Sequence, residues 1–302
     1  MQGLIALSSL FVCASVLGAT VEPVQSPEQD EAAVLAFWDP ARMRQAERAV
    51  GGPANPVDEV LTENGDHLGF VREAHAHQGA LSSRAGILFY VSGDGVPQHC
   101  SATVLKSAQE NLVLTAAHCV IERGEVWKQK MLFVPAYDGA AAEGERAPFG
   151  RWPIRYKYIP HLEAYRSEES DLAIVSIFAQ GDQSLEQAVG GGSRACLSER
   201  GSQLPNSQIW GYPGVSYSGG EMRRCLSRMD DLEGSSGVGT PNCSTISGSS
   251  GSAFRFQQND DWAIAVVHGS GQSTRLREST FQALYRLASG SDAVVPRCLT
   301  KG

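Results

Sequence analysis

From residue 85 onward, short runs of apolar and β-branched residues alternate with turns rich in glycine, serine and proline. The runs are AGILFYV, HCSATVL, NLVLTAAHCV, KMLFVPAY, DLAIVSIF, SQIWGYP and WAIAVVHG. Runs of this length between turn residues predict β-strands. They form two groups, about residues 85–189 and 195–277, divided by a linker at Gly190-Gly191-Gly192-Ser193. We therefore expect an all-β domain over residues 85–302, built in two halves.

Two other stretches have helical periodicity. Near the C-terminus, apolar residues recur at the spacing of an amphipathic helix, namely Phe281, Leu284, Tyr285 and Ala288. This predicts a helix over about residues 279–289, with Ser279 or Thr280 as its N-cap. Residues 20–84 are rich in Glu, Gln, Ala, Pro and His, with one helical stretch around Ala32–Val50. We expect residues 20–84 to be a pro-segment or a loosely packed N-terminal extension.

The N-terminus carries an apolar run, LIALSSLFVCASVLGA, over residues 4–19. It is short for a membrane span and ends in small residues, which is typical of a signal peptide over residues 1–19. A buried core segment is the alternative, because no Lys or Arg precedes the run. Removal of the signal leaves six cysteines, and an even set in an exported chain indicates disulfides. We therefore expect a secreted protein.

Composition excludes several classes of function. The chain of 302 residues is 42% hydrophobic and has a net charge of -8. This composition is that of a globular protein, and the negative charge offers no basic surface for nucleic acid or an anionic membrane. His75 and His77 have no further ligand cluster beside them, so we expect no metal there.

Three short motifs carry candidate chemistry. His118 ends an apolar strand in TAAHC, Asp171 opens one in SDLAIV, and Ser250 is framed by glycines in GSSGS. A serine hydroxyl attacks a carbonyl only with a base, an acid that orients the base, and donors for the oxyanion. Each motif alone also fits a structural role. His118 could be a histidine whose ring is hydrogen-bonded within the fold, Asp171 a residue that caps a strand, and Ser250 part of a serine–glycine turn. Their chain order, His then Asp then Ser, is that of the chymotrypsin group.

Together TAAHC, SDLAIV and GSSGS resemble the chymotrypsin-fold serine peptidases, and the likeness extends over residues 85–290. The segments CSA, FVPAYDG, APFGRW and WGYPG resemble secreted members of the glutamyl-endopeptidase branch. The resemblance implies two six-stranded antiparallel β-barrels with the catalytic cleft between them. It makes Ser250 the nucleophile, His118 the base and Asp171 the orienting acid. The backbone N–H groups of Gly248 and Ser250 would form the oxyanion hole.

The resemblance also bears on substrate choice. Trypsin-like members carry an aspartate six residues before the nucleophile, where this chain has Ser244. Glutamyl endopeptidases place a threonine and a histidine where this chain has Thr245 and His268, followed by Gly269 and Ser270. A hydroxyl and an imidazole can bind a carboxylate, which favours cleavage after Glu or Asp. Relaxed specificity, with His268 as an ordinary strand-end histidine, is the alternative.

By the same resemblance, disulfides join Cys100 to Cys119 and Cys225 to Cys243, which leaves Cys196 with Cys298. The resulting hypothesis is a secreted, monomeric serine endopeptidase that acts on proteins or peptides and needs no cofactor. The usual Ile-Val-Gly-Gly start of an activated enzyme is absent, so a zymogen would be cut elsewhere, near Glu63, Glu73 or Arg84. A catalytically silent binding or adhesion protein of the same fold is the alternative function.

Overall fold

The computed structural model describes residues 22–51, 69–201, 205–214, 217–243, 245–258, 260–269 and 271–298. The expected signal segment, residues 1–19, lies outside these ranges, as do Glu63 and Ser270. No helix within the described ranges has the length and apolar character to cross a membrane.

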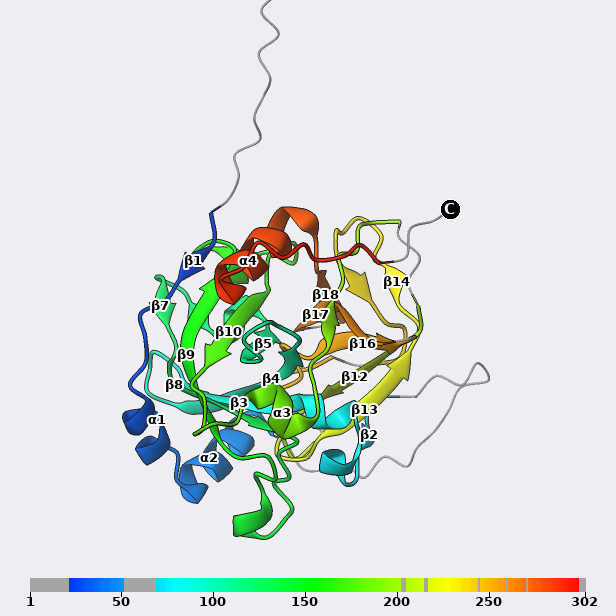
Figure 1. The fold of residues 1–302 in the computed structure, drawn as a ribbon. Helices are drawn as coiled ribbons and strands as arrows, with labels where there is room; N and C mark the ends of the chain where they lie inside the picture. The colour runs from blue at the N-terminus through cyan, green and yellow to red at the C-terminus, as the bar shows by residue number, and fades with distance from the viewer. Residues whose placement is uncertain are drawn as a thin grey trace, which may run out of the picture.

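The first half of the β-domain is a closed antiparallel barrel (Figure 1). Neighbouring strands follow the order β9-β10-β5-β4-β3-β8, and β8 pairs back with β9 to close the ring. Large apolar side chains such as Leu88, Val104 and Ile174 fill its interior. The strands are β3 (Ala85–Val91), β4 (Pro97–Leu105), β5 (Leu112–Thr115), β8 (Gln129–Pro135), β9 (Trp152–Ile159) and β10 (Ala173–Ile177), with the hairpin β6 (Ile121–Glu122) and β7 (Val126–Trp127) beside them.

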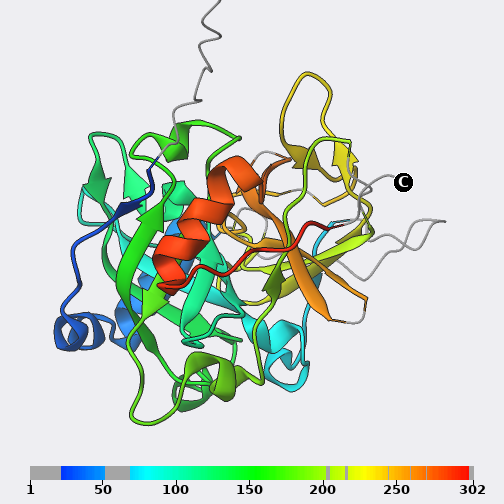
Figure 2. The same cartoon turned by 45° about the horizontal axis from the view of Figure 1, so that its top comes forward.

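The second half is a curled sheet that lies beside the first barrel (Figures 1 and 2). Its order is β14-β15-β18-β17-β16-β12-β13-β2, and β11 adds to β17 in parallel. A separate apolar core that includes Ile209, Phe254 and Val267 lies against it. Its strands are β11 (Arg194–Ala195), β12 (Ser207–Gly211), β13 (Arg223–Ser227), β14 (Asp230–Asp231), β15 (Val238–Gly239), β16 (Ala253–Gln257), β17 (Asp261–Gly269) and β18 (Gln272–Arg275), with β2 (Val71–Arg72) at one edge.

The segment expected to be a pro-segment or a loosely packed extension packs against the β-domain over the residues that the structure describes. Strand β1 (Val24–Gln25) pairs with β9, and α1 (Glu31–Phe37) and α2 (Pro40–Val50) pack against the first barrel (Figure 1). Trp38 is fully buried, beside the ring of Phe89 at 5.2 Å. Strand β2 pairs with β13 of the second sheet. The extension therefore contacts both halves of the domain.

Capping residues decide where the helices begin and end. The expected single stretch over Ala32–Val50 is two helices, because Pro40 cannot continue a helix and instead starts α2, with the Asp39 side chain accepting from the N–H of Arg42 at 2.8 Å. At the C-terminus, a helical turn begins at Glu278 after Arg277 and leads into α4 (Ala283–Ser289). Neither Ser279 nor Thr280 is therefore the N-cap.

The glycine-rich linker is packed between the two halves. Helix α3 (Leu185–Val189) ends at Gly190, which has φ of 78°. Ser193 is fully buried, and its backbone N–H donates to the carbonyl of Val104 on β4. Beyond α4, the C-terminal stretch crosses to the second sheet (Figure 2). There Cys196 and Cys298 form a disulfide. The two halves are thus joined by more than one segment of chain.

Candidate active site

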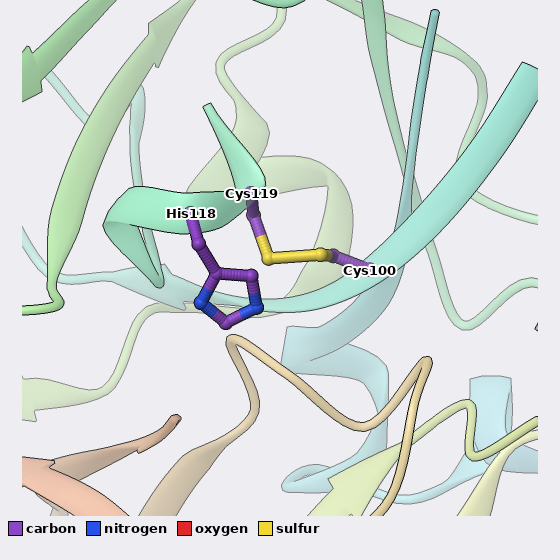
Figure 3. Close-up of side chains that lie close together, drawn as sticks. All are labelled: Cys100, His118 and Cys119. Carbon is purple, nitrogen blue, oxygen red and sulfur yellow. A yellow bond between two sulfur atoms is a disulfide. The ribbon is translucent and has the colours of Figure 1, made fainter. Parts of the chain in front are cut away.

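His118 lies at the end of the apolar strand β5. The strand stops at Thr115, and a short 3₁₀ turn over Ala117–Cys119 presents the imidazole. The disulfide between Cys100 and Cys119, with Cα atoms 6.1 Å apart, ties this turn to β4 (Figure 3). Because the turn is held at both ends, the position of the His118 ring is fixed relative to the barrel.

Asp171 is fully buried directly before β10, and both of its carboxylate oxygens are engaged. Its Oδ1 accepts from the His118 backbone N–H at 2.8 Å, and its Oδ2 lies 2.6 Å from His118 Nδ1. Burial alone would raise the pKa of Asp171, but the charge of His118 and hydrogen bonds from His118 and His268 outweigh it and lower the pKa. Asp171 is therefore a carboxylate at neutral pH, and it holds His118 with Nδ1 as the donor.

A second imidazole shares the same carboxylate oxygen. His268, near the end of β17, also directs its Nδ1 at Asp171 Oδ2, and its ring stands edge-on to that of His118 with centroids 5.8 Å apart. The hydrogen bond to Asp171 raises the pKa of His268 above its ordinary value, against the opposing effect of burial. The sequence indicated His268 as a pocket residue, but nothing local in the chain indicated its contact with Asp171.

Ser250 lies in a tight turn between two glycines with left-handed backbone, Gly248 at φ of 89° and Gly251 at 86°. Its Oγ donates to the carbonyl oxygen of His268 at 3.4 Å and makes no hydrogen bond to His118 in this structure. Ser250 and His118 nevertheless line one cavity of about 370 Å³. The structure thus brings together the three residues of the sequence hypothesis, with the hydroxyl turned toward His268.

The backbone around Ser250 leaves two donors free. Neither Gly248 N–H nor Ser250 N–H donates to another described residue. Ser101 on β4 fixes the turn, since its Oγ donates to the Gly248 carbonyl at 2.7 Å and its N–H donates to the Ser250 carbonyl at 2.8 Å. A Cβ at position 248 would lie 2.4 Å from the Tyr212 carbonyl oxygen, so only glycine fits there. Two free N–H groups beside a hydroxyl can stabilise an oxyanion.

Ser250 also lines a second cavity, of about 730 Å³. Thr245, His268 and Gly269 line it, and the disulfide Cys225–Cys243 lies at its wall. The Thr245 Oγ1 accepts from the N–H of Gly271 at 2.9 Å, so its hydroxyl hydrogen has no acceptor among the described residues. No Asp, Glu, Lys or Arg is among the described residues that line this cavity.

Two groups of side chains in the described chain have the spacing of a metal site. In one, Cys100 and Cys119 are joined as a disulfide, so no thiolate is present for a metal. The other comprises His118, Asp171 and His268, whose ligand atoms lie within 4.8 Å of one another. Here both Nδ1 atoms face the same oxygen of the Asp171 carboxylate, which accepts from them.

Some lining residues were not expected from the sequence. Ala49 and Val50, at the end of α2, line the cavity shared by His118 and Ser250, together with Tyr90 and Gln98 on β3 and β4. Strand periodicity places Tyr90 and Gln98 on the barrel, but it carries no signal for which of them faces the cavity. Val50 lies in a segment without family resemblance, so no motif indicated it.

The arrangement of the two sheets matches solved structures. A protease from Arthrobacter nicotinovorans superposes with a TM-score of 0.57 over 69% of this chain and 96% of its own, at 22% identity. The chain has the chymotrypsin-like fold. A thermostable serine protease from an extremophilic microorganism matches with a TM-score of 0.58 over 70% of this chain and 100% of its own, at 22% identity.

A Glu endopeptidase, solved in complex with MPD, matches over 74% of this chain and 97% of its own, with a TM-score of 0.56 and 18% identity. No family model and no curated protein matches the sequence. In this chymotrypsin-like fold, His118 and Asp171 belong to the first barrel, and Ser250 and His268 belong to the second sheet. The candidate site therefore lies where the two halves meet.

Proposed function

We propose that the protein is a serine endopeptidase in which Ser250 is the nucleophile, His118 the general base and Asp171 the residue that orients the base. The observation that supports this most strongly is the 2.6 Å contact between His118 Nδ1 and Asp171 Oδ2. Because Nδ1 donates to a carboxylate, Nε2 carries the lone pair that accepts the serine proton. The chymotrypsin-like fold and the free N–H groups at the turn are consistent with this role.

In the proposed reaction, Ser250 Oγ exchanges its contact with the His268 carbonyl for one with His118. Oγ then bonds to the substrate carbonyl carbon while its proton passes to His118 Nε2, and the N–H groups of Gly248 and Ser250 stabilise the oxyanion. The C–N bond breaks as His118 returns the proton to the leaving amine. Water attacks the resulting ester by the same route and releases the acid. This reaction requires no metal or organic cofactor.

We further propose a preference for Glu or Asp before the cut. The support is the chemistry of the cavity on the Thr245 side, where the Thr245 hydroxyl hydrogen has no acceptor among the described residues and His268 has a raised pKa. A His268 ring whose Nδ1 donates to Asp171 presents Nε2 to its surroundings, and the protonated ring offers Nε2–H. A hydroxyl and an imidazolium together can bind a carboxylate with charge-assisted hydrogen bonds.

Export belongs to the same proposal, with residues 1–19 as a cleaved signal and a monomer as the secreted form. Three disulfides support export, namely Cys100–Cys119, Cys196–Cys298 and Cys225–Cys243. Such bonds persist in oxidising compartments and are rare in the cytosol. N-terminal sequencing of the secreted protein would locate the mature start.

The test of the proposed function is hydrolysis of a peptide library by the secreted protein and by its Ser250→Ala variant. We expect the wild-type protein to cut after acidic residues and the variant to lose activity with its thermal unfolding unchanged. Equal hydrolysis by both proteins would remove Ser250 from the mechanism. A folded wild-type protein without any hydrolysis would favour the binding or adhesion role.

A further inference from the structure

The cavity shared by His118 and Ser250 is on the side of the nucleophile where a leaving group departs. His118 must protonate the leaving amine, so the part of the substrate after the cut lies on the His118 side. The Thr245 cavity has Ser250 but not His118 in its lining, whereas both residues line the cavity of about 370 Å³. A side chain directly after the cut therefore has the cavity of about 370 Å³ available to it.

The end of α2 supplies one wall of this cavity. Ala49 and Val50 line it together with Tyr90, Gln98 and Cys100. These two residues belong to the N-terminal extension, which the resemblance to serine peptidases does not cover. The extension thus reaches the site of the chemistry and does more than cover the barrel.

Specific polar contacts fasten the end of α2 where it is. The buried ring of His99 has Nδ1 at 3.2 Å from the Ala46 carbonyl and Nε2 at 3.0 Å from the Tyr212 carbonyl. Tyr137 donates its hydroxyl to the carboxylate of Glu47 at 2.5 Å. His99 thus lies between α2 and the loop that packs against the oxyanion glycine, and its ring, whose pKa burial lowers, donates to one of the two carbonyls.

Glycines in the facing loop allow the close approach of α2. A Cβ at Gly214 would lie 1.9 Å from the Val50 carbonyl oxygen, and one at Gly219 would lie 2.6 Å from the Glu47 carbonyl oxygen. Neither contact is tolerable for a larger residue at its present position. The loop over the second sheet is thus shaped to the helix of the extension, as expected of a permanent contact.

We propose that the end of α2, through Ala49 and Val50, forms one wall of the subsite that receives the residue directly after the cut. It follows that residues 22–51 remain part of the active enzyme. The inference rests on the proposed peptidase function. The lining holds no Asp, Glu, Lys or Arg among the described residues, and its side chains are aliphatic, aromatic, amide, imidazole and hydroxyl groups beside the disulfide of Cys100. The subsite therefore suits an uncharged side chain of moderate size.

The test compares three proteins: wild type, Val50→Trp and Gln45→Trp. Gln45 is exposed on the same helix and lines none of these cavities, so it serves as the matched control. The substrates are three peptides that share the same residue before the cut and carry Ala, Leu or Phe directly after it. We expect Val50→Trp to lower kcat/KM for Leu and Phe at least tenfold relative to Ala, because the indole fills the subsite. Gln45→Trp should leave the order of kcat/KM among the three peptides as in the wild type. Val50→Ala should raise kcat/KM for the Phe peptide relative to the other two.

Labelling with a fluorophosphonate distinguishes failure of this inference from failure of the proposed function. The reagent reports on the nucleophile alone, because its fluoride leaving group is too small to need the subsite. Labelling at the wild-type rate in Val50→Trp, with an unchanged ranking of Ala, Leu and Phe, would overturn the inference and leave the proposed function standing. Absence of labelling in the wild-type protein would instead overturn the proposed function. Mass spectrometry of the labelled active form provides a second check, since loss of residues 22–51 from it would contradict the claim that they are retained.

Discussion

At the scale of single residues, the feature that distinguishes this site is one carboxylate between two imidazoles. Asp171 accepts from His118 and from His268, although His268 lies 97 residues further along the chain. The sequence motifs indicated each side chain separately, His118 as a base and His268 as a pocket residue. They could not indicate that both rings depend on Asp171, because that contact arises only where the two sheets meet.

Replacement of Asp171 should therefore affect catalysis and specificity together. In Asp171→Asn, the amide no longer holds His118 in the required tautomer, and we expect kcat to fall about 10⁴-fold. The same variant removes the carboxylate that raises the pKa of His268, so discrimination between Glu and Gln before the cut should also weaken. Steady-state kinetics with matched Glu and Gln peptides measure both effects. A large loss of kcat with unchanged discrimination would separate His268 from Asp171.

The acid preference should depend on pH. The groups that face His268 are Asp171 and Glu168, which raise its pKa, and the edge-on ring of His118. Its imidazolium is present below this raised pKa and is lost as pH rises through it. The ratio of kcat/KM for Glu over Gln peptides should thus be highest between about pH 5, where a Glu side chain is ionised, and the pKa of His268.

The ratio of kcat/KM for the two peptides cancels any effect of pH on the catalytic groups, because both peptides use the same ones. In His268→Asn the ratio should be independent of pH and lower by about 10- to 100-fold, the range of one charge-assisted hydrogen bond of about 1.5–3 kcal/mol. A wild-type ratio that rises with pH would contradict the assignment of His268.

At the scale of elements, hydrophobic periodicity predicted the strands well and the extension poorly. Apolar runs between turns are a local signal, and β3, β4, β10 and β17 lie where such runs occur. The packing of α1 and α2 depends instead on distant partners, such as Tyr137 for Glu47 and His99 for Ala46. No local pattern reports these contacts, so a polar helical stretch looked loosely attached.

The buried face of this extension makes a stability prediction. Trp38 is fully buried, donates its indole N–H to the Lys130 carbonyl and stacks near Phe89. In Trp38→Ala the cavity and the unpaired carbonyl should reduce the free energy of unfolding by about 3–5 kcal/mol. Leu35→Ala, at an exposed position of α1, should change it by less than about 0.5 kcal/mol. Urea unfolding measures both, and similar effects of the two changes would mean that the extension is not part of the cooperative core.

At the scale of the whole molecule, a buried ion cluster joins the extension, the linker and the second sheet. Asp261, 3% exposed, accepts from Arg84 at 3.0 Å and from Ser193 at 2.7 Å, and it pairs with Arg255, which is 1% exposed. The sequence indicated the glycine-rich linker but not that its serine would be buried in this cluster. Burial alone would raise the pKa of Asp261, but the charge of Arg255 and hydrogen bonds from its partners lower it.

Loss of this carboxylate should destabilise the joined halves. Asp261→Asn leaves Arg255 buried without its counter-charge, and we expect the free energy of unfolding to fall by about 3–5 kcal/mol. Asp260→Asn, which removes the exposed pair with Arg194, should cost about 0–1 kcal/mol. Because the folded-state pKa of Asp261 is lowered, its contribution is present above the unfolded value of about 3.9 and is lost as pH falls through the folded value. The unfolding temperature of Asp261→Asn should therefore lie below that of the wild type at pH 7, and this difference should shrink as the pH is lowered to 2.

The measurement that tests the central claim most directly is the mapping of a fluorophosphonate adduct by peptide mass spectrometry in the wild type, Ser250→Ala and Ser249→Ala. The account predicts one adduct, on Ser250, in the wild type. It predicts no adduct in Ser250→Ala and an adduct still on Ser250 in Ser249→Ala, because the Ser249 hydroxyl is committed to the Ile246 carbonyl at 2.6 Å. An adduct on another serine of the turn, or none on the folded wild-type protein, would contradict it.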